Sequence, residues 1–145
     1  MNLHNFHSNS NQSNCIMMWI FMLIATTHSS THCVYLKGLG TKRNPSFFPV
    51  ACGERAQRLN PLRFDLLPSF CDHKCIANYD TNKHAYDSEQ LTQIACNAFN
   101  RYSGPSTYRV VFSESMGNLI FAAALHQKRC VKTENDFWVS LVAPW

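Results

Sequence analysis

The stretch that decides the fold is residues 108–125, YRVVFSESMGNLIFAAAL, where a β-branched run meets a short polar turn and then an alanine-rich apolar segment. Residues 108–113 have the composition of a buried strand, and residues 117–127 are predicted to form a helix that is apolar on nearly every face. Ser115 lies in the turn between them. A serine at this place is either a helix N-cap or a nucleophile held above the end of a strand.

The residues around Ser115 favour a nucleophile. A sharp turn from strand to helix brings the two elements close together, so the residues two positions before and two positions after the serine must be small. Ser113 and Gly117 occupy these positions. Ser115 would then stand at the N-terminus of the following helix, where the helix dipole and free N–H groups stabilise an oxyanion. The backbone N–H of Met116 is the first predicted donor to that oxyanion.

Further strands and helices are predicted before and after this turn. A strand over residues 33–36 ends at the loop GLG, residues 38–40, and two more strands are predicted over residues 74–79 and 137–143. A capping box with Asp87 as its N-cap starts a helix, which ends at Gly104 and the proline after it. The prolines of residues 41–73 limit that segment to short helical turns. Strands that alternate with helices predict an α/β fold, with a mostly parallel sheet that has helices on both faces.

Two of these segments resemble motifs of the α/β-hydrolase family, in particular of its lipase- and esterase-like members. In that family the turn commonly reads Gly-His-Ser-Met-Gly-Gly, and here residues 113–118 read SESMGN. The Ser-Met-Gly core is the same, whereas Glu114 replaces the histidine and a serine replaces the first glycine. Residues 34–40, VYLKGLG, are similar to the family's strand that ends in His-Gly-x-Gly, with Lys37 in place of the histidine. The resemblance covers about residues 33–145.

The resemblance implies which groups would act at the site. Ser115 would form an acyl-enzyme with an ester or lipid-like small-molecule substrate, and neither a cofactor nor a metal ion is expected. The Leu39 N–H would be the second oxyanion donor, beside that of Met116. The residues that would shape the loop and the turn are Gly38, Gly40, Ser113 and Gly117.

The remaining catalytic groups are not found in this sequence. In the family an acid and a histidine follow the serine along the chain. The only histidine after Ser115 is His126, about 16 Å away along the predicted helix, which is beyond hydrogen-bond reach. Glu134 and Asp136 precede the last strand and would lie at the wrong end of a parallel sheet. His73 and His84 precede the serine, so either could act as the base only if the family's order were broken. The chain is therefore expected to be a partial α/β-hydrolase domain with little or no activity of its own.

The N-terminal residues predict export. Residues 15–25, CIMMWIFMLIA, carry no charge, and these eleven residues fall short of the roughly 20 that span a bilayer. They match the apolar region of a signal peptide over residues 1–30, with cleavage between residues 27 and 30, which leaves a domain over residues 31–145. The segment before them lacks Lys and Arg, so a buried N-terminal helix is one alternative and a membrane anchor is another. A secreted protein without a stable membrane span is the prediction.

The cysteines agree with export. Once Cys15 is removed with the signal peptide, an even set of six remains, which suggests up to three disulfides among fifteen connectivities. The six are Cys33, Cys52, Cys71, Cys75, Cys96 and Cys130. A zinc site at residues 71–75, CDHKC, is the alternative use of two of them.

Charge and composition exclude some partners and leave others open. The formal net charge is +4, and the basic side chains are scattered along the chain instead of forming a run, so no nucleic-acid partner is expected. A non-catalytic secreted protein that retains a hydrolase scaffold remains an alternative to the enzyme, because a fold does not by itself imply an activity. A small binding protein stabilised by disulfides or zinc is a second alternative.

Overall fold

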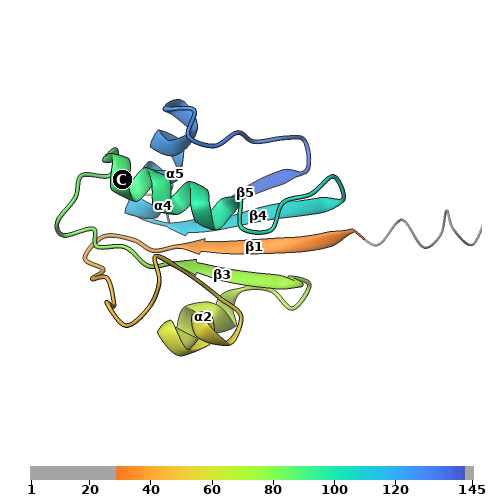
Figure 1. Ribbon diagram of the computed structural model, residues 1–145, viewed down its shortest axis with the longest axis horizontal. Coiled ribbons are helices and arrows are strands. Elements are labelled where there is room, and N and C mark those ends of the chain that lie inside the picture. Colours follow the sequence, from red (N-terminus) through yellow and green to blue (C-terminus); the bar gives the residue numbers. More distant parts are fainter. Residues whose placement is uncertain (1–28, 143–145) are drawn as a thin grey trace, which may run out of the picture.

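The computed structural model describes residues 29–142, which form one five-stranded sheet with strand order β2-β3-β1-β4-β5 (Figure 1). Four strands are parallel, and the short β2 pairs antiparallel with β3 at one edge. The fold is therefore of the α/β type, as predicted. The strands are β1 (Ser30–Leu36), β2 (Val50–Cys52), β3 (His73–Ala77), β4 (Thr107–Glu114) and β5 (Asp136–Val142).

Helices lie on both faces of the sheet, which confirms the expected arrangement. On one face α4 (Glu89–Phe99) and α5 (Met116–His126) pack side by side, and on the other face lie α2 (Glu54–Leu59) and α3 (Pro61–Leu66) (Figure 1). The segment with four prolines holds only the two short helices and β2. Asn60 ends α2 and caps α3, since its side chain accepts a hydrogen bond from the Arg63 N–H.

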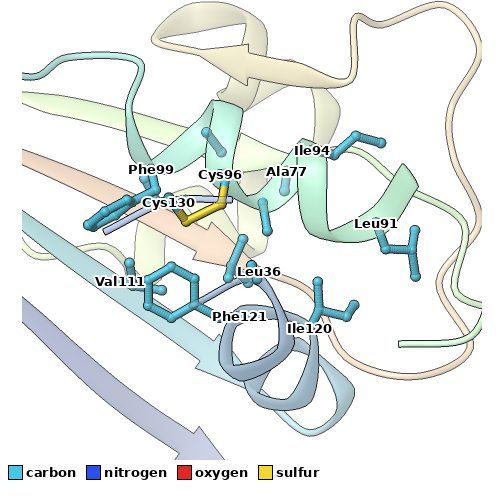
Figure 2. Close-up of a cluster of buried hydrophobic side chains, with 14 of the residues drawn as sticks. Leu36, Ala77, Leu91, Ile94, Cys96, Phe99, Val111, Ile120, Phe121 and Cys130 are labelled. Atoms are coloured by element: carbon cyan, nitrogen blue, oxygen red, sulfur yellow. A yellow bond between two sulfur atoms is a disulfide. The ribbon is translucent and has the colours of Figure 1, made fainter. Parts of the chain in front are cut away.

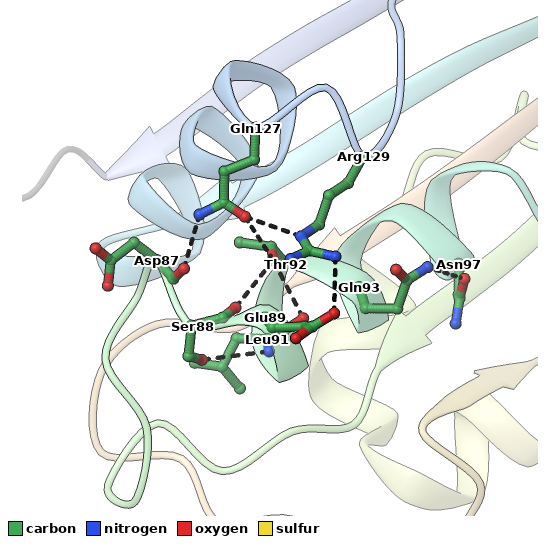
Figure 3. Close-up of polar contacts among 9 residues, drawn as sticks. All are labelled: Asp87, Ser88, Glu89, Leu91, Thr92, Gln93, Asn97, Gln127 and Arg129. Atoms are coloured by element: carbon green, nitrogen blue, oxygen red, sulfur yellow. Dashed lines mark hydrogen bonds and ion pairs between the residues drawn. The ribbon is translucent and has the colours of Figure 1, made fainter.

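The start of α4 differs from the predicted one by one residue. Ser88, not Asp87, is the N-cap, and its Oγ accepts from the Leu91 N–H at 3.4 Å (Figure 3). The carbonyl of Asp87 instead accepts from the Gln127 side-chain amide at 2.7 Å, which ties the start of α4 to the end of α5. The helix ends at Phe99, before the predicted stop at Gly104, because Asn100 already has a non-helical backbone.

The larger core lies between the sheet and the helices α4 and α5 (Figure 2). Its apolar side chains come from alternate positions of β1 and β3, from Val111 of β4 and from the inner faces of both helices. Phe121 packs edge-on against Phe99 at 5.3 Å and against Trp138 at 5.1 Å between ring centroids. This core fixes α5, and therefore the turn that precedes it.

A smaller core lies under α2 and α3, and it does not extend across the whole sheet. It includes Tyr35, Ile76 and Phe112. On the same face, β4 and β5 carry four apolar side chains that are 38–53% exposed, and three of them, Tyr108, Phe137 and Val139, border a shallow hollow of about 460 Å³. No helix among the described residues covers this part of β4 and β5, so the parallel strands are covered on both faces only in part. The exposed side chains are Tyr108, Phe137, Val139 and Leu141.

The six predicted cysteines form three disulfides: Cys33–Cys71, Cys52–Cys75 and Cys96–Cys130. The third lies in the larger core (Figure 2). Because Cys71 and Cys75 belong to different disulfides, neither supplies a thiolate, and the alternative of a zinc site at residues 71–75 is wrong. Residues 29–142 contain no cluster of three side chains that would hold a metal ion.

The predicted signal peptide lies outside the described residues, apart from residues 29 and 30. Across residues 29–142, no helix has the length and apolar content that a membrane span requires. Disulfides form and persist in oxidising compartments, so the three bonds are compatible with secretion.

A buried ion pair joins the beginnings of β4 and β5. The guanidinium of Arg109 donates to both carboxylate oxygens of Asp136 at 2.6 Å, and their side chains are 10% and 0% exposed. The same guanidinium also donates to the Asn100 side-chain oxygen at 2.7 Å and lies 3.9 Å from the Phe99 ring centroid. It thereby connects the end of α4 with both strands.

Candidate functional site

The turn at Ser115 has the backbone of a strained strand-to-helix turn. Ser115 follows the last residue of β4 and precedes the first residue of α5, with φ 46° and ψ −122°. It is one of two residues other than glycine with a positive φ in residues 29–142, the other being Lys128. Such a conformation costs about 1–3 kcal/mol, and it persists only where the surroundings enforce it. The contacts around the turn therefore decide whether it is a site.

Gly117 allows α5 to begin directly against the end of β1. A Cβ at this position would lie 2.5 Å from the carbonyl oxygen of Leu36 and 2.9 Å from that of Lys37. Both distances are too short for any side chain. The small residue that the sequence predicted two positions after the serine is thus required by the backbone of β1.

The glycine loop after β1 lies against the same turn. A Cβ on Gly38 would be 3.1 Å from the Ser115 Cβ, and in the sheet Leu36 pairs with Ser113. Gly40 has a φ of 78°, which suits glycine. Leu39, between the two glycines, is 69% exposed. The two motifs predicted to form one site, 75 positions apart in the chain, are therefore adjacent at the carboxyl edge of the sheet.

Ser113 does more than provide a small side chain. It is fully buried, its Oγ donates to the Asn118 side-chain oxygen at 2.6 Å, and it accepts from the Trp138 Nε1–H at 2.7 Å. Asn118 in turn donates to the Ser115 carbonyl at 3.2 Å. This chain of hydrogen bonds links β5, β4 and the first turn of α5 beneath Ser115. The sequence did not indicate these roles, because Asn118 stands where the resembled motif has a glycine and Trp138 lies outside the motif.

Glu114, which replaces the expected histidine, connects the turn to α3 and to the glycine loop. Its carboxylate forms an ion pair with Arg63 at 3.1 Å and accepts a long hydrogen bond of 3.4 Å from the Gly38 N–H. The Arg63 guanidinium lies 5.7 Å from the ring centroid of Tyr35. Burial, and then the neighbouring Glu114 carboxylate, raise the pKa of the Tyr35 hydroxyl. Tyr35 therefore stays neutral and cannot act as a base near neutral pH.

Lys37, which also replaces a histidine of the resembled motif, is buried at the end of β1. Its Nζ lies 5.8 Å from the ring centroid of Tyr79, and the Tyr79 hydroxyl donates to the Lys37 carbonyl at 2.7 Å. Burial lowers the pKa of Lys37, although the nearby Asp80 carboxylate opposes this effect. This contact fixes the strand end from which the glycine loop departs.

No described histidine is hydrogen-bonded to Ser115. His126 is exposed at the end of α5, as expected. His73, the first residue of β3, stacks on Tyr102 with 4.2 Å between ring centroids, at the end of the strands far from Ser115. His32, near the start of β1, is buried and bonded to the Ala98 carbonyl at 2.9 Å. His84 lies in the connection from β3 to α4.

The two acidic residues considered from the sequence lie where expected. Asp136 begins β5 and is paired with Arg109, and Glu134 precedes it in an exposed turn. The parallel strands β4 and β5 begin at one end of the sheet, and Ser115 lies at the other end, after the last residue of β4. Neither acid is placed to orient a base there.

The two oxyanion donors inferred from the resemblance lie at the same edge of the sheet as Ser115. Met116 is the first residue of α5, and Leu39 lies in the loop that contacts the turn through Gly38. A helix of eleven residues begins here, so its free N–H groups and its dipole favour a negative charge near Ser115.

Comparisons of this chain with models of known families, with curated proteins and with solved structures found no match.

Proposed function

We propose that Ser115 is the nucleophile of a serine hydrolase site of the α/β-hydrolase type, in a secreted protein that acts on an ester or lipid-like substrate. One observation carries the proposal. Ser115 has a strained backbone between β4 and α5, and it is held there by a glycine on each side: Gly117 against β1 and Gly38 against the serine itself. A serine that only capped a helix would need neither the positive φ nor the glycine loop beside it.

The chemistry would follow the usual course of acyl transfer. The Ser115 oxygen attacks the ester carbonyl carbon as its proton passes to a base, and the charge that develops on the carbonyl oxygen is stabilised by the Met116 and Leu39 N–H groups. Collapse of the tetrahedral intermediate expels the alcohol and leaves an acyl-enzyme, which water then hydrolyses. The base has to come from outside the described residues or from His84. In its absence, a non-catalytic protein with the same scaffold is the second candidate function.

The first test asks whether the turn stabilises an anion, which does not require a base. In Ser115→Cys, the thiol would sit where the serine oxygen does, and we expect its pKa to be about one unit or more below the ordinary value of about 8.5. The measurement is the rate of alkylation as a function of pH in the folded, oxidised chain. Ser103→Cys, in an exposed loop, is the matched control. Equal thiol pKa values at both positions would refute an oxyanion site at Ser115.

The second test asks whether a base is present in this chain. We expect a fluorophosphonate probe to label the purified chain no faster than its Ser115→Ala variant, because no described histidine is bonded to Ser115. Labelling above that background would contradict this expectation and show that a base acts on Ser115. His84→Ala would then identify the base, since labelling that disappears in that variant would assign the role to His84.

A further inference from the structure

A second concave surface lies along the sheet edge formed by β2. It is a cleft of about 1080 Å³, bordered by α2 and the segment before β2 on one side and by the last turn of α4 and the residues after it on the other. Asn100 in this cleft is bonded to Arg109 near the start of β4, whereas Ser115 follows the end of β4. The cleft therefore lies near the beginnings of the parallel strands, whereas the turn at Ser115 lies at their carboxyl ends.

Three arginines line this cleft: Arg55, Arg58 and Arg101. None of them forms an ion pair with a described residue, whereas Arg63, Arg109 and Arg129 each pair with a carboxylate. Glu54 is the only carboxylate among the described residues that line the cleft. The formal charge of the lining is thus +2, from three arginines and one glutamate. Guanidinium groups without a carboxylate partner are suited to bidentate contacts with phosphate or sulfate.

Two asparagines add hydrogen-bond donors to the same cleft. The side-chain oxygen of Asn100 accepts from Arg109, and because a guanidinium can only donate, the amide NH₂ of Asn100 is the group left for a ligand. The oxygen of Asn97 likewise accepts from Gln93 at 2.9 Å, which leaves its NH₂ (Figure 3). A surface that offers guanidinium and amide N–H groups selects a ligand rich in acceptor oxygens.

We propose that this cleft binds an oligoanion that carries at least two phosphate or sulfate groups. One group would contact Arg55 and Arg58, which are three positions apart and therefore neighbours on α2, and another would contact Arg101 together with the asparagine amides. The C-terminal end of α4 points its carbonyl groups toward this region and opposes an anion, so binding has to depend on the arginines. Arg55 lies 5.6 Å from the ring centroid of Phe48, a contact that limits its freedom before a ligand binds.

The test is calorimetric titration of the purified chain with inorganic pyrophosphate at low ionic strength. We expect Arg55→Gln/Arg58→Gln to weaken binding by about tenfold or more, and Arg101→Gln to weaken it by several-fold, because charge-assisted hydrogen bonds are lost. Lys42→Gln/Arg43→Gln is the matched control, since it removes the same charge from an exposed loop outside the cleft and is expected to change affinity less than twofold. Binding should also weaken with added salt, because salt screens exposed charges.

Three results would overturn the proposal: no binding of pyrophosphate, binding that the cleft variants leave unchanged, or an equal loss in the control pair. Ser115→Ala should bind pyrophosphate like the original chain, so the outcome is independent of the proposed hydrolase. A second arm uses phosphatidylcholine vesicles with and without phosphatidic acid. Sedimentation with the phosphatidic acid vesicles, lost in Arg55→Gln/Arg58→Gln, would identify a lipid headgroup as the source of the phosphate, and no sedimentation would indicate a free anion.

Discussion

Replacing Arg109 with methionine is expected to lower the free energy of unfolding by about 3–5 kcal/mol, because the Asp136 carboxylate would remain buried without its partner. The carboxylate side chain is 0% exposed, and both of its oxygens accept from the guanidinium at 2.6 Å. Methionine keeps much of the packing against Phe99, so the effect reports the lost charge. Urea unfolding of the oxidised chain, followed by circular dichroism, measures it.

Two further variants separate the ion pair from other effects. In Arg109→Met/Asp136→Leu no charge is left buried, so we expect part of the stability to return relative to Arg109→Met alone. Arg129→Met is the matched control, because its partner Glu89 is 82% exposed and the loss should stay below about 1 kcal/mol (Figure 3). A double variant less stable than Arg109→Met would contradict this account of the pair.

The same ion pair predicts how stability depends on pH. Burial alone would raise the pKa of Asp136, but the hydrogen bonds from Arg109 and Thr133 outweigh it and lower the pKa below its ordinary value of 3.8. The unfolded chain therefore binds a proton more readily than the folded chain does. Asp136 therefore contributes its full share to the free energy of unfolding at pH values above 3.8, and this share is lost as the pH falls through the lowered pKa of the folded chain. In Asp136→Asn this part of the acid dependence should be absent.

Replacing Gly117 with alanine is expected to destabilise the fold by about 1–3 kcal/mol and to displace the turn at Ser115. The added Cβ would meet the Leu36 carbonyl oxygen at 2.5 Å, and a backbone atom in the middle of the sheet cannot move aside as a flexible side chain can. Helix α5 would have to shift away from β1. The free energy of unfolding and, in the Ser115→Cys background, the thiol pKa measure the two consequences.

Gly104→Ala is the control for this substitution. At Gly104 the nearest atom to an added Cβ would be the Thr107 hydroxyl oxygen at 3.4 Å, compared with 2.5 Å for the Leu36 oxygen at Gly117. The free energy of unfolding should therefore fall by no more than about 1 kcal/mol. Equal losses at the two glycines would mean that the contact between α5 and β1 does not determine the turn. A Gly117→Ala chain that keeps the low thiol pKa at position 115 would mean the same.

The strand–turn–helix at Ser115 could be predicted because its signal is local. A β-branched run, two small residues and an apolar run occupy fewer than twenty consecutive positions. Strand β2 could not be predicted, because three residues carry no periodicity and they form a strand only by pairing with β3. The predicted N-cap of α4 was wrong by one position, because aspartate and serine are both favourable N-cap residues and Asp87 and Ser88 are adjacent. The choice depends on Gln127, which bonds the Asp87 carbonyl from another helix.

The candidate site could also be predicted only where its signal is local. Ser113, Gly117 and the glycine loop follow from the motifs, but the partners that hold them come from distant segments. Trp138 bonds Ser113 from 25 positions away, and Arg63 pairs with Glu114 from 51 positions away. The arginines of the β2 cleft were not predicted for a similar reason. Arg55 and Arg58 lie on α2 and Arg101 follows the end of α4, and these segments meet only in the folded chain, so the sequence shows the three arginines as scattered charges.

The pattern of disulfides divides the covalent structure into two closed parts. Cys33–Cys71 and Cys52–Cys75 cross-link only residues before position 76, and Cys96–Cys130 cross-links only residues after position 95. No disulfide within residues 29–142 spans the connection between them, residues 78–88. A protease that cut this connection would leave two fragments joined by non-covalent contacts alone: the β1–β4 pairing, the packing of α4 and α5 against β1 and β3, and polar contacts such as the Arg63–Glu114 ion pair. Such a nick would stay hidden in the folded protein, and the fragments would separate on denaturation without any reductant.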